Sequence, residues 1–271
     1  MASDRCLGAL RATNQMVDLH CHILPGLDDG PAEMDESVAM AESAIADGIT
    51  HIVATPHASH GFAFNYQRTR ELRDELQEKV GDRLKLATGC DFHLSPENLL
   101  ALRKDSAPFC IHQKNYLLVE LNQVSIPPSM DQTLHELQLA GLRPIITHPE
   151  RNTLLRSRPE QFRGWIRQGC FAQVTGGALT GFFGPSAQAV AESWIAGGLI
   201  HFVSSDAHGT RRRVLNLRPA FDAVLHKFGS ETARALFKEN PLAAFEGGEL
   251  PHIPEVSDAP VKLRRKWFFF S

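Results

Sequence analysis

Two histidines two positions apart close the first apolar stretch of the chain, residues 17–22. On a β-strand, residues two apart project from the same face of the sheet. The imidazoles of His20 and His22 can therefore reach one metal ion at the end of such a strand, while Cys21 points away. A single pair at this spacing also arises by chance, so it is weak evidence for a metal site when it stands alone.

Five later segments end in the same way, with a histidine or a carboxylate at or just after a short apolar run; these residues are His57, Asp91, Glu120, His148, Asp206 and His208. Each has an ordinary structural explanation. Glu120 could face water, His148 could be a capped core histidine, and Asp206 could be a helix N-cap. Jointly, so many ligand-type side chains at equivalent positions are difficult to explain without metal, because a buried, unpaired carboxylate is costly.

The elements that must position these residues alternate between strand and helix. Apolar and β-branched runs predict strands at 16–19, 49–55, 84–90, 116–121, 143–147, 171–174 and 200–204. Helical spacing predicts helices from Met34 to a cap at Gly48, over 65–80, from a capping box at 129–132 to Gly141, over 159–169, near 186–196, and two within 217–247. The segment 175–181 is expected to be a glycine-rich loop that offers backbone amides.

This alternation predicts an α/β fold with a parallel sheet and right-handed crossovers. Seven units in one domain favour a distorted (β/α)7 barrel, similar to a TIM barrel, over an open sheet. In such a barrel the carboxyl ends of all strands meet on one face, where active sites form. The scattered histidines and carboxylates would then become one cluster.

Composition indicates a soluble globular protein: 43% of the 271 residues are hydrophobic and 22% are charged. The net charge of −3 gives no reason to expect nucleic acid as a partner. The chain has no apolar run of membrane-spanning length and no signal-peptide pattern, so we expect a cytoplasmic location. Five scattered cysteines suit reduced thiols better than a disulfide framework; they are Cys6, Cys21, Cys90, Cys110 and Cys170.

The candidate ligands are imidazoles and carboxylates without a thiolate. Such a set argues against structural zinc and for a catalytic cluster of divalent Mn, Fe or Zn. Eight ligands exceed the need of one ion, so we infer two or three ions, which would activate water for hydrolysis and hold a phosphate-like anion. The other histidines are interpreted as structural, although His60 and His93 lie near enough to the rim to contact substrate or support a ligand.

At this point the residues resemble a known family. The sequence is similar to the PHP (polymerase and histidinol phosphatase) superfamily, and most similar to its bacterial polysaccharide-associated tyrosine-protein phosphatases. The resemblance extends over about residues 16–250, and its blocks are residues 18–30 (DLHCHILPGLDDG), 54–57 (ATPH), 118–120 (LVE), 147–152 (THPERN) and 204–208 (SSDAH).

The resemblance implies a PHP-type barrel with three metal sites. The first ion would be held by His20, His22, Asp91 and Asp206, the second by Asp91, Glu120 and His148, and the third by Asp29, His57 and His208. The family usually has glutamate where Asp91 stands, so either this shorter carboxylate bridges the two ions or another residue does. Asp29 enters only through the family pattern, and its neighbour Asp28 is the obvious rival.

The resemblance also implies a metal-dependent protein-tyrosine phosphatase with Mn as the preferred ion, in which a metal-bridging hydroxide attacks phosphorus. Arg151, Asp206 and His208 are the expected catalytic residues. Arg151 can pair with phosphate, and one arginine of the run Arg211-Arg212-Arg213 is expected to assist it, with Arg211 and Arg212 as first candidates. The expected substrate is a phosphotyrosine protein, specifically a bacterial tyrosine kinase that regulates capsular or exopolysaccharide synthesis.

Cysteine-based phosphatase chemistry is excluded by spacing, because none of the five cysteines has an arginine six positions later. Two alternatives remain open: another PHP phosphoesterase, such as a histidinol-phosphate phosphatase or a nuclease-like member, and a non-catalytic metal-binding scaffold. The chain is divided into a leader (1–15), the phosphatase domain (16–250) and a tail (251–271). The basic and aromatic run 262–270 is expected to be an ordinary terminus, with contact to a membrane surface as the less favoured interpretation.

Overall fold

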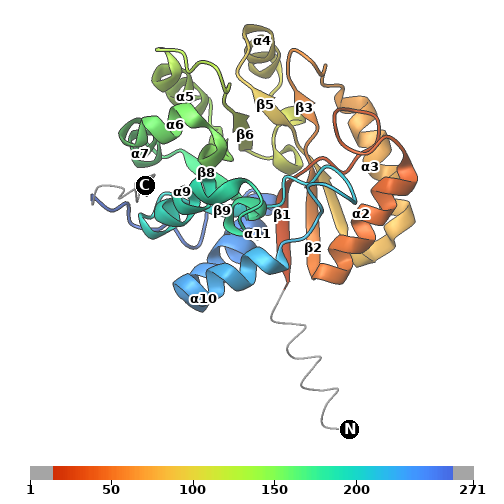
Figure 1. Cartoon of the computed structure of the whole chain (residues 1–271). Helices are drawn as coiled ribbons and strands as arrows, with labels where there is room; N and C mark the ends of the chain where they lie inside the picture. The colour runs from red at the N-terminus through yellow and green to blue at the C-terminus, as the bar shows by residue number, and fades with distance from the viewer. Residues whose placement is uncertain (1–14, 259–271) are drawn as a thin grey trace, which may run out of the picture.

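The computed structural model describes residues 15–258, in which parallel strands form two sheets surrounded by helices (Figure 1). The smaller sheet has the order β1-β2-β4 and the larger has the order β3-β5-β6-β7-β8-β9. The strands are β1 (Met16–Cys21), β2 (Ile49–Ala54), β3 (His57–Ala58), β4 (Lys85–Thr88), β5 (Asp91–His93), β6 (Tyr116–Glu120), β7 (Arg143–Thr147), β8 (Phe171–Thr175) and β9 (Phe202–Ser204). The predicted α/β class and parallel pairing are confirmed.

The chain passes from the smaller sheet into the larger one at short bends between β2 and β3 and between β4 and β5. The predicted strand 84–90 is split into β4 and β5 at Gly89, where an added Cβ would lie 2.9 Å from a methyl group of Val53. At the other edge, β1 meets the end of β9 through the Asp206 N–H donating to the His20 carbonyl and the His22 N–H donating to the Ala207 carbonyl, both at 2.9 Å. These contacts form only an isolated bridge. The pairing therefore establishes two parallel sheets and not a continuous closed barrel.

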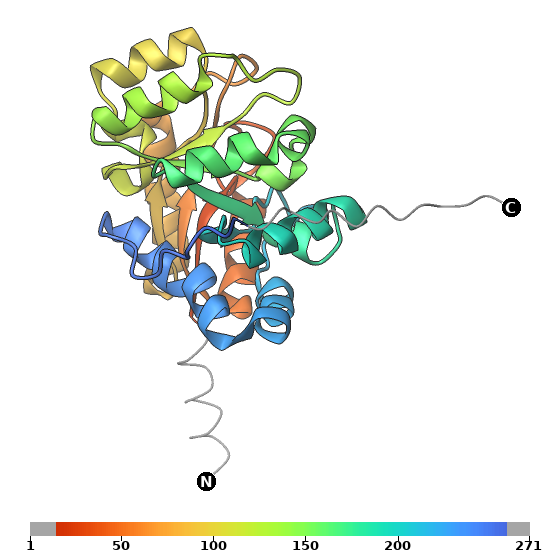
Figure 2. The same cartoon turned by 90° about the vertical axis from the view of Figure 1, so that its left-hand side faces the viewer.

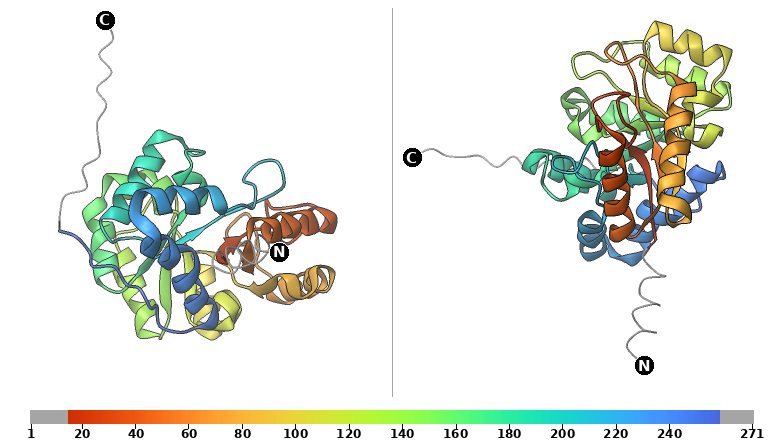
Figure 3. Two further views of the ribbon diagram at one scale, coloured as in Figure 1. Left: turned by 90° about the horizontal axis from the view of Figure 1, so that it is seen from below. Right: turned by 90° about the vertical axis from the view of Figure 1, so that its right-hand side faces the viewer.

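Helices cover the outside of the sheets. They are α2 (Met34–Asp47), α3 (Tyr66–Val80), α4 (Pro96–Lys104), α5 (Met130–Leu139), α6 (Thr153–Ser157), α7 (Pro159–Arg167), α8 (Gly176–Leu179), α9 (Gly184–Ala196), α10 (Arg218–Arg234) and α11 (Asn240–Glu246). Figure 3 shows α2 and α3 side by side against the three-stranded sheet. The sequence did not predict α4 or α6, which are short and lie between the expected elements.

Two local predictions are wrong and one is confirmed. The expected glycine-rich loop at 175–181 instead begins with α8, whose N-terminal N–H at Ala178 donates to the Thr175 hydroxyl at 3.3 Å. The capping box at Ser129 does not form, because the Ser129 side chain accepts no bond from the helix. By contrast, Gly48 ends α2 as expected, with φ +92° and its N–H directed at the carbonyls of Ala44 and Ile45.

Apolar side chains close the amino ends of the strands and leave the carboxyl ends for polar residues. Val17, Tyr116 and Phe202 pack with Phe245 of α11 in one buried cluster. Figure 2 shows α10 and α11, in blue, at this lower end of the molecule. The Tyr116 hydroxyl donates to the Gly248 carbonyl at 2.9 Å. The opposite end of the sheets is therefore the face on which the ligand-type residues gather.

Residues 251–258 run along the body of the protein, where the Ser257 N–H donates to the Gly197 carbonyl and the Asn240 amide donates to the His252 carbonyl. Residues 1–14 of the predicted leader, Cys6 and the basic and aromatic run 262–270 lie outside the described residues. Within the described part of the chain, none of the helices combines the length and the apolar character needed to cross a membrane. The division into leader, domain and tail stays a prediction.

Candidate metal centre

The histidines and carboxylates singled out in the sequence converge at one rim of the two sheets, where β1, β6, β7 and β9 end and β3 and β5 begin. His20 lies on β1 and His22 follows it, while His57 and Asp91 begin β3 and β5. Glu120 is the last residue of β6, His148 follows β7, and Asp206 and His208 lie in the loop after β9. Parallel strands deliver these residues to one rim although they are up to 188 positions apart in the sequence (20 to 208).

The most deeply buried group consists of His20, His22, Asp91 and Asp206. The Nε2 atoms of His20 and His22 lie 3.2 Å apart. His20 Nε2 is 3.5 Å from Asp91 Oδ2 and 3.4 Å from Asp206 Oδ1, and His22 Nε2 is 3.5 Å from the same Asp206 oxygen. Facing imidazole nitrogens with two carboxylate oxygens at this spacing form a set that can share one cation.

Asp91 connects this group to a second one. Its Oδ2 atom is 3.3 Å from His57 Nδ1 and 4.0 Å from His148 Nε2. The same His148 nitrogen lies 3.7 Å from Glu120 Oε1. One carboxylate thus faces three imidazoles, which is the arrangement expected of a carboxylate between two ions.

Asp29 and Asp28 have different surroundings. Asp29 Oδ1 is 3.4 Å from His57 Nε2 and 3.2 Å from His208 Nε2, so these three residues form a third group. Asp28 accepts instead from His22 Nδ1 at 2.6 Å and from the backbone N–H groups of Gly30 and His57. Geometry therefore favours Asp29 as a ligand and gives Asp28 the task of orienting His22.

The Nδ1 atoms of two further site histidines, His20 and His208, are also engaged. His20 Nδ1 is 3.0 Å from Gln173 Oε1, and His208 Nδ1 is 2.9 Å from the Asp206 carbonyl. With Nδ1 held in this way, the Nε2 atoms of His20 and His22 face the centre of the cluster, whereas His208 Nε2 lies between Asp29 Oδ1 and the Arg213 guanidinium. Such outer contacts fix the tautomer and the orientation of a metal-ligating imidazole.

The buried cluster contains polar atoms without a conventional partner. Asp91 Oδ2 and His57 Nδ1 are shielded from solvent and make no hydrogen bond. A buried carboxylate oxygen left in this way is costly unless a cation compensates it. The donor set and these two atoms fit divalent ions, which bind imidazole and carboxylate together.

Electrostatics set different protonation states within the cluster. Burial alone would lower the pKa of His22 and His57, but hydrogen bonds to neighbouring carboxylates outweigh it and raise the pKa of His22 to about 9 and that of His57 to about 12, so metal binding would displace their protons. Burial alone would raise the pKa of Asp91, but the nearby His20 and His57 outweigh it and hold the pKa well below its usual range. Burial, assisted by the charge of Arg151, lowers the pKa of His148 to about 4. His148 is therefore neutral near pH 7, which is the form of imidazole that binds metal.

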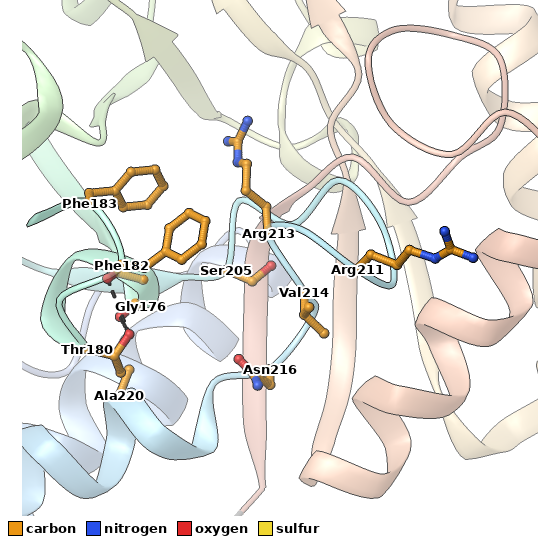
Figure 4. A pocket seen from close by; sticks show the side chains of 11 residues that line it. Gly176, Thr180, Phe182, Phe183, Ser205, Arg211, Arg213, Val214, Asn216 and Ala220 are labelled. Atoms are coloured by element: carbon orange, nitrogen blue, oxygen red, sulfur yellow. Dashed lines mark hydrogen bonds between the residues drawn. The ribbon is translucent and has the colours of Figure 1, made fainter.

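Two arginines border the cluster at Asp206. Arg151 Nη1 and Arg213 Nη2 both pair with Asp206 Oδ2, and Arg213 Nη1 lies 3.0 Å from His208 Nε2. Of the arginine run, it is Arg213 that reaches the site, whereas the first candidates Arg211 and Arg212 are exposed and make no ion pair with the cluster. Figure 4 shows the Arg211 side chain directed away from Arg213.

Three site residues have left-handed backbone conformations without being glycine: His148 (φ +32°), Asp206 (φ +52°) and Arg213 (φ +51°). Such conformations are strained for ordinary side chains and are concentrated at functional sites. They aim these side chains at the rim, and no propensity read from the sequence would predict them.

His93 belongs closer to the site than the sequence interpretation placed it. Its Nε2 pairs with Glu120 Oε2, and His57, His93 and Glu120 form a further group able to hold an ion. The available signal was that His93 stands two positions after Asp91, the same spacing as His20 and His22. His60 lines a cavity of about 270 Å³ beside His93 and Glu120.

The cysteines in the described part of the chain take no part in this chemistry. The four described cysteines, Cys21, Cys90, Cys110 and Cys170, are free and buried. Burial raises the pKa of each thiol. A thiol that stays protonated is a poor nucleophile.

Comparisons with known proteins agree with this arrangement. Residues 16–246 match the family described as capsular polysaccharide synthesis, CpsB/CapC. The tyrosine-protein phosphatase YwqE of Bacillus subtilis is 32% identical over 267 residues, which cover 94% of this chain and 100% of the relative. The tyrosine-protein phosphatase CpsB of Streptococcus pneumoniae is 28% identical over 239 residues, covering 83% and 96%.

Solved structures show the same relationship. A crystal structure from work on YwqE of Bacillus subtilis and CpsB of Streptococcus pneumoniae, described as unique metal-dependent tyrosine phosphatases, is 31% identical to this chain, with a TM-score of 0.82. The match covers 90% of this chain and 100% of that structure. A histidinol phosphate phosphatase from Lactococcus lactis is 13% identical with a TM-score of 0.53, covering 80% and 95%, and so shares the fold alone.

Proposed function

This chain belongs to the CpsB/CapC family of capsular polysaccharide synthesis, and we propose that it is a metal-dependent protein-tyrosine phosphatase. Membership confirms the resemblance to polysaccharide-associated tyrosine phosphatases that the motif blocks indicated. The observation that carries the proposal is the position of Asp91 Oδ2, buried among three imidazoles and without a hydrogen-bond partner.

We assign the metal-holding residues to three groups that share members, as the family resemblance implied. The first group is His20, His22, Asp91 and Asp206; the second is Asp91, Glu120 and His148; the third is Asp29, His57 and His208. Divalent ions bound there, with Mn as our first choice, would supply Lewis acidity and lower the pKa of water in the site toward neutrality. The distances among the ligand atoms support this assignment.

Arg151 and Arg213 are assigned to the phosphate. Two guanidinium groups face one carboxylate at Asp206, so positive charge remains available for an anion. Guanidinium pairs with phosphate oxygens in a planar, bidentate way and stabilises the charge that develops on them during transfer. Asp206 and His208, the other two expected catalytic residues, lie beside these arginines. His208 Nδ1 contacts the Asp206 carbonyl, and His208 Nε2 lies close to the Arg213 guanidinium.

The biological setting follows from the family. We infer that the substrate is a phosphotyrosine protein, specifically a bacterial tyrosine kinase that regulates capsular or exopolysaccharide synthesis. A reducing, cytoplasmic location is supported by the free, buried thiols of the described cysteines. We also infer that the two sheets together make a distorted barrel, with the isolated bridge between Cys21 of β1 and Ala207, which follows β9, as its seam.

The test is turnover of a phosphotyrosine peptide by purified protein loaded with Mn, compared with histidinol phosphate and single-stranded DNA. We expect the phosphotyrosine peptide to be preferred, activity to be lost with EDTA, and activity to survive iodoacetamide. Preference for histidinol phosphate or DNA would favour another PHP phosphoesterase. Sensitivity to iodoacetamide without sensitivity to EDTA would contradict the proposal.

The scaffold alternative is tested with Arg151→Ala and the exposed Arg103→Ala as its matched control. We expect Arg151→Ala to reduce turnover by about 100-fold, the size of effect seen when a transition-state donor is removed. Arg103→Ala should retain full activity. If metal is bound in all three proteins and Arg151→Ala changes no assay, the protein is a metal-binding scaffold and not an enzyme.

A further inference from the structure

A cavity of about 210 Å³ opens beside the arginines that border the metal centre (Figure 4). Its wall includes Phe182, Phe183, Ser205, Arg213 and Val214. Arg213 belongs to both places, because it lines the cavity and pairs with Asp206. A group bound in this cavity would therefore lie next to an anion held by Arg151 and Arg213.

Aromatic rings form one wall of the cavity. The Phe182 and Phe183 rings meet edge to face, with centroids 5.0 Å apart. Phe183 also carries the Arg151 guanidinium over its ring at 4.4 Å. Phe182 is 57% exposed, which leaves much of a large apolar side chain uncovered at the mouth of a site. Figure 4 shows both rings on one side of the cavity, with Ser205 and Val214 across from them.

The backbone at Gly177 packs closely against Phe182 and Phe183. An added Cβ at Gly177 would lie 3.0 Å from Phe183 Cε2 and 3.6 Å from Phe182 Cβ. The Phe182 N–H donates to the Gly177 carbonyl at 2.9 Å, which closes the turn that carries both phenylalanines. The start of α8 thus holds the aromatic wall in place beside the arginines.

We propose that this cavity, here called the aryl subsite and formed by Phe182, Phe183, Val214 and the stem of Arg213, binds the phenyl ring of phosphotyrosine. The inference rests on the proposed function and deepens it, because it makes this cavity the source of a preference for aryl over alkyl phosphate esters. The Arg213 guanidinium, which pairs with Asp206 of the metal centre, and the exposed Phe182 ring on the cavity wall complement an anion joined directly to an aromatic ring.

The size of the cavity agrees with this occupant. A cavity of about 150 Å³ already accepts a benzene molecule, so about 210 Å³ has room for one phenyl ring. An additional aromatic contact contributes a factor of about 5 in affinity. A methyl or alkyl phosphate would reach the arginines without covering Phe182 and would forgo that factor.

The experiment compares two phosphonates that cannot be hydrolysed, phenylphosphonate and methylphosphonate, by titration calorimetry on Mn-loaded protein. We expect the wild type to bind phenylphosphonate about fivefold more tightly, as one aromatic contact allows. Phe182→Ala should remove most of this preference by weakening the phenyl probe alone, and Phe182→Leu should have an intermediate effect. The matched control is Leu100→Ala, an equally exposed apolar residue on α4 (58%), which should keep the preference.

A kinetic readout separates this role from a structural one. For a phosphotyrosine peptide, Phe182→Ala should raise KM about fivefold with kcat within about twofold, because the ring contact is present in both ground and transition states. A wild type without preference for the phenyl probe, or a Phe182→Ala variant that keeps it, would overturn the inference. Because the calorimetry needs no turnover, it decides the aryl subsite even if the protein hydrolyses none of the substrates tested for the proposed function.

Discussion

Asp91 shows how a short side chain can take a central position. Its carboxylate faces His20, His57 and His148, although it has one methylene less than the glutamate that the motif resemblance led us to expect. The bend at Gly89, which separates β4 from β5, lets the backbone at Asp91 begin a strand directly at the rim. The backbone therefore brings the carboxylate to the imidazoles, and a longer side chain is not required.

Replacing Asp91 with asparagine tests the bridging assignment. Asp91→Asn removes one negative charge and directs an amide at three imidazoles, so we expect it to lose at least one of the bound ions. Turnover should fall by about 100-fold or more, since the site loses charge compensation that acts in a buried setting. Metal analysis of the purified variant provides the measurement, with Asp74→Asn on the exposed face of α3 as control. Unchanged metal content would show that another residue bridges.

Asp28 tests the outer contacts of the same cluster. Asp28→Ala leaves His22 Nδ1 without its acceptor, so the ring can rotate and present the wrong nitrogen. Loss of such an outer partner typically weakens metal affinity by about 10- to 100-fold. Competition titration with a Mn chelator measures this, and the neighbouring exposed Asp35→Ala should retain wild-type affinity. If Asp28→Ala instead abolishes one site completely, Asp28 and not Asp29 is the ligand.

At the scale of elements, regular patterns were predictable from the sequence and loops were not. Apolar runs predicted the strands that end at or just before His20, Glu120 and His148. The clustering of these residues was predictable too, because the carboxyl ends of parallel strands share one edge. The choice of Arg213 from its run depends on a left-handed backbone in a loop, which residue types do not specify. The short α8 formed where glycines indicated a loop, since Thr175 caps it and tertiary contacts override weak propensity.

The pairing of β8 with β9 buries a histidine that offers a pH test. His201 is 2% exposed, and its Nδ1 accepts from the Ala172 N–H at 3.3 Å. Burial lowers its pKa to about 4 from the ordinary value of 6.5, so the folded protein keeps it neutral while the unfolded chain takes up a proton below pH 6.5. Folding stability is therefore lost as pH falls through this window, by about 2 kcal/mol between pH 7 and pH 5.

The variant His201→Asn keeps an acceptor near Ala172 but cannot titrate. We expect it to be less stable than wild type at pH 7, because packing beside Phe171 is lost. The difference between the two proteins should shrink by about 2 kcal/mol at pH 5, since only the wild type is penalised by acid. Urea unfolding in EDTA measures this difference free of metal effects. A constant difference across the pH range would mean that His201 titrates normally in the folded state.

At the scale of the whole molecule, the candidate metal centre joins the two sheets. His20 and His22 come from the smaller sheet and its following loop, whereas Asp91, Glu120 and His148 come from the larger sheet or directly follow it. Side chains of both sheets share a buried core, but their backbones are connected only through bends and one isolated bridge in the described part of the chain. Ions held by both sets of residues would therefore cross-link parts of the fold whose backbone pairing is interrupted.

This arrangement predicts that metal stabilises the folded protein as a whole. The ligands are far apart in the sequence, so the unfolded chain has no preformed site and binding favours the folded state. At a Mn concentration 100-fold above the dissociation constant, one site adds about 2.7 kcal/mol. For a chain of this size, that corresponds to a rise of about 5 to 10 °C in Tm.

Thermal unfolding in Mn and in EDTA measures the effect. The rise should be largely lost in Asp91→Asn, which removes the residue shared by two groups of ligands, and retained in Asp74→Asn. Above the dissociation constant it should also keep growing with the logarithm of the free Mn concentration, because mass action continues to favour the folded state after the sites are filled. A Tm that is the same in Mn and EDTA would mean that the cluster binds ions no better in the folded chain than in the unfolded one. The joining role assigned to the centre would then be wrong, whatever activity the protein retained.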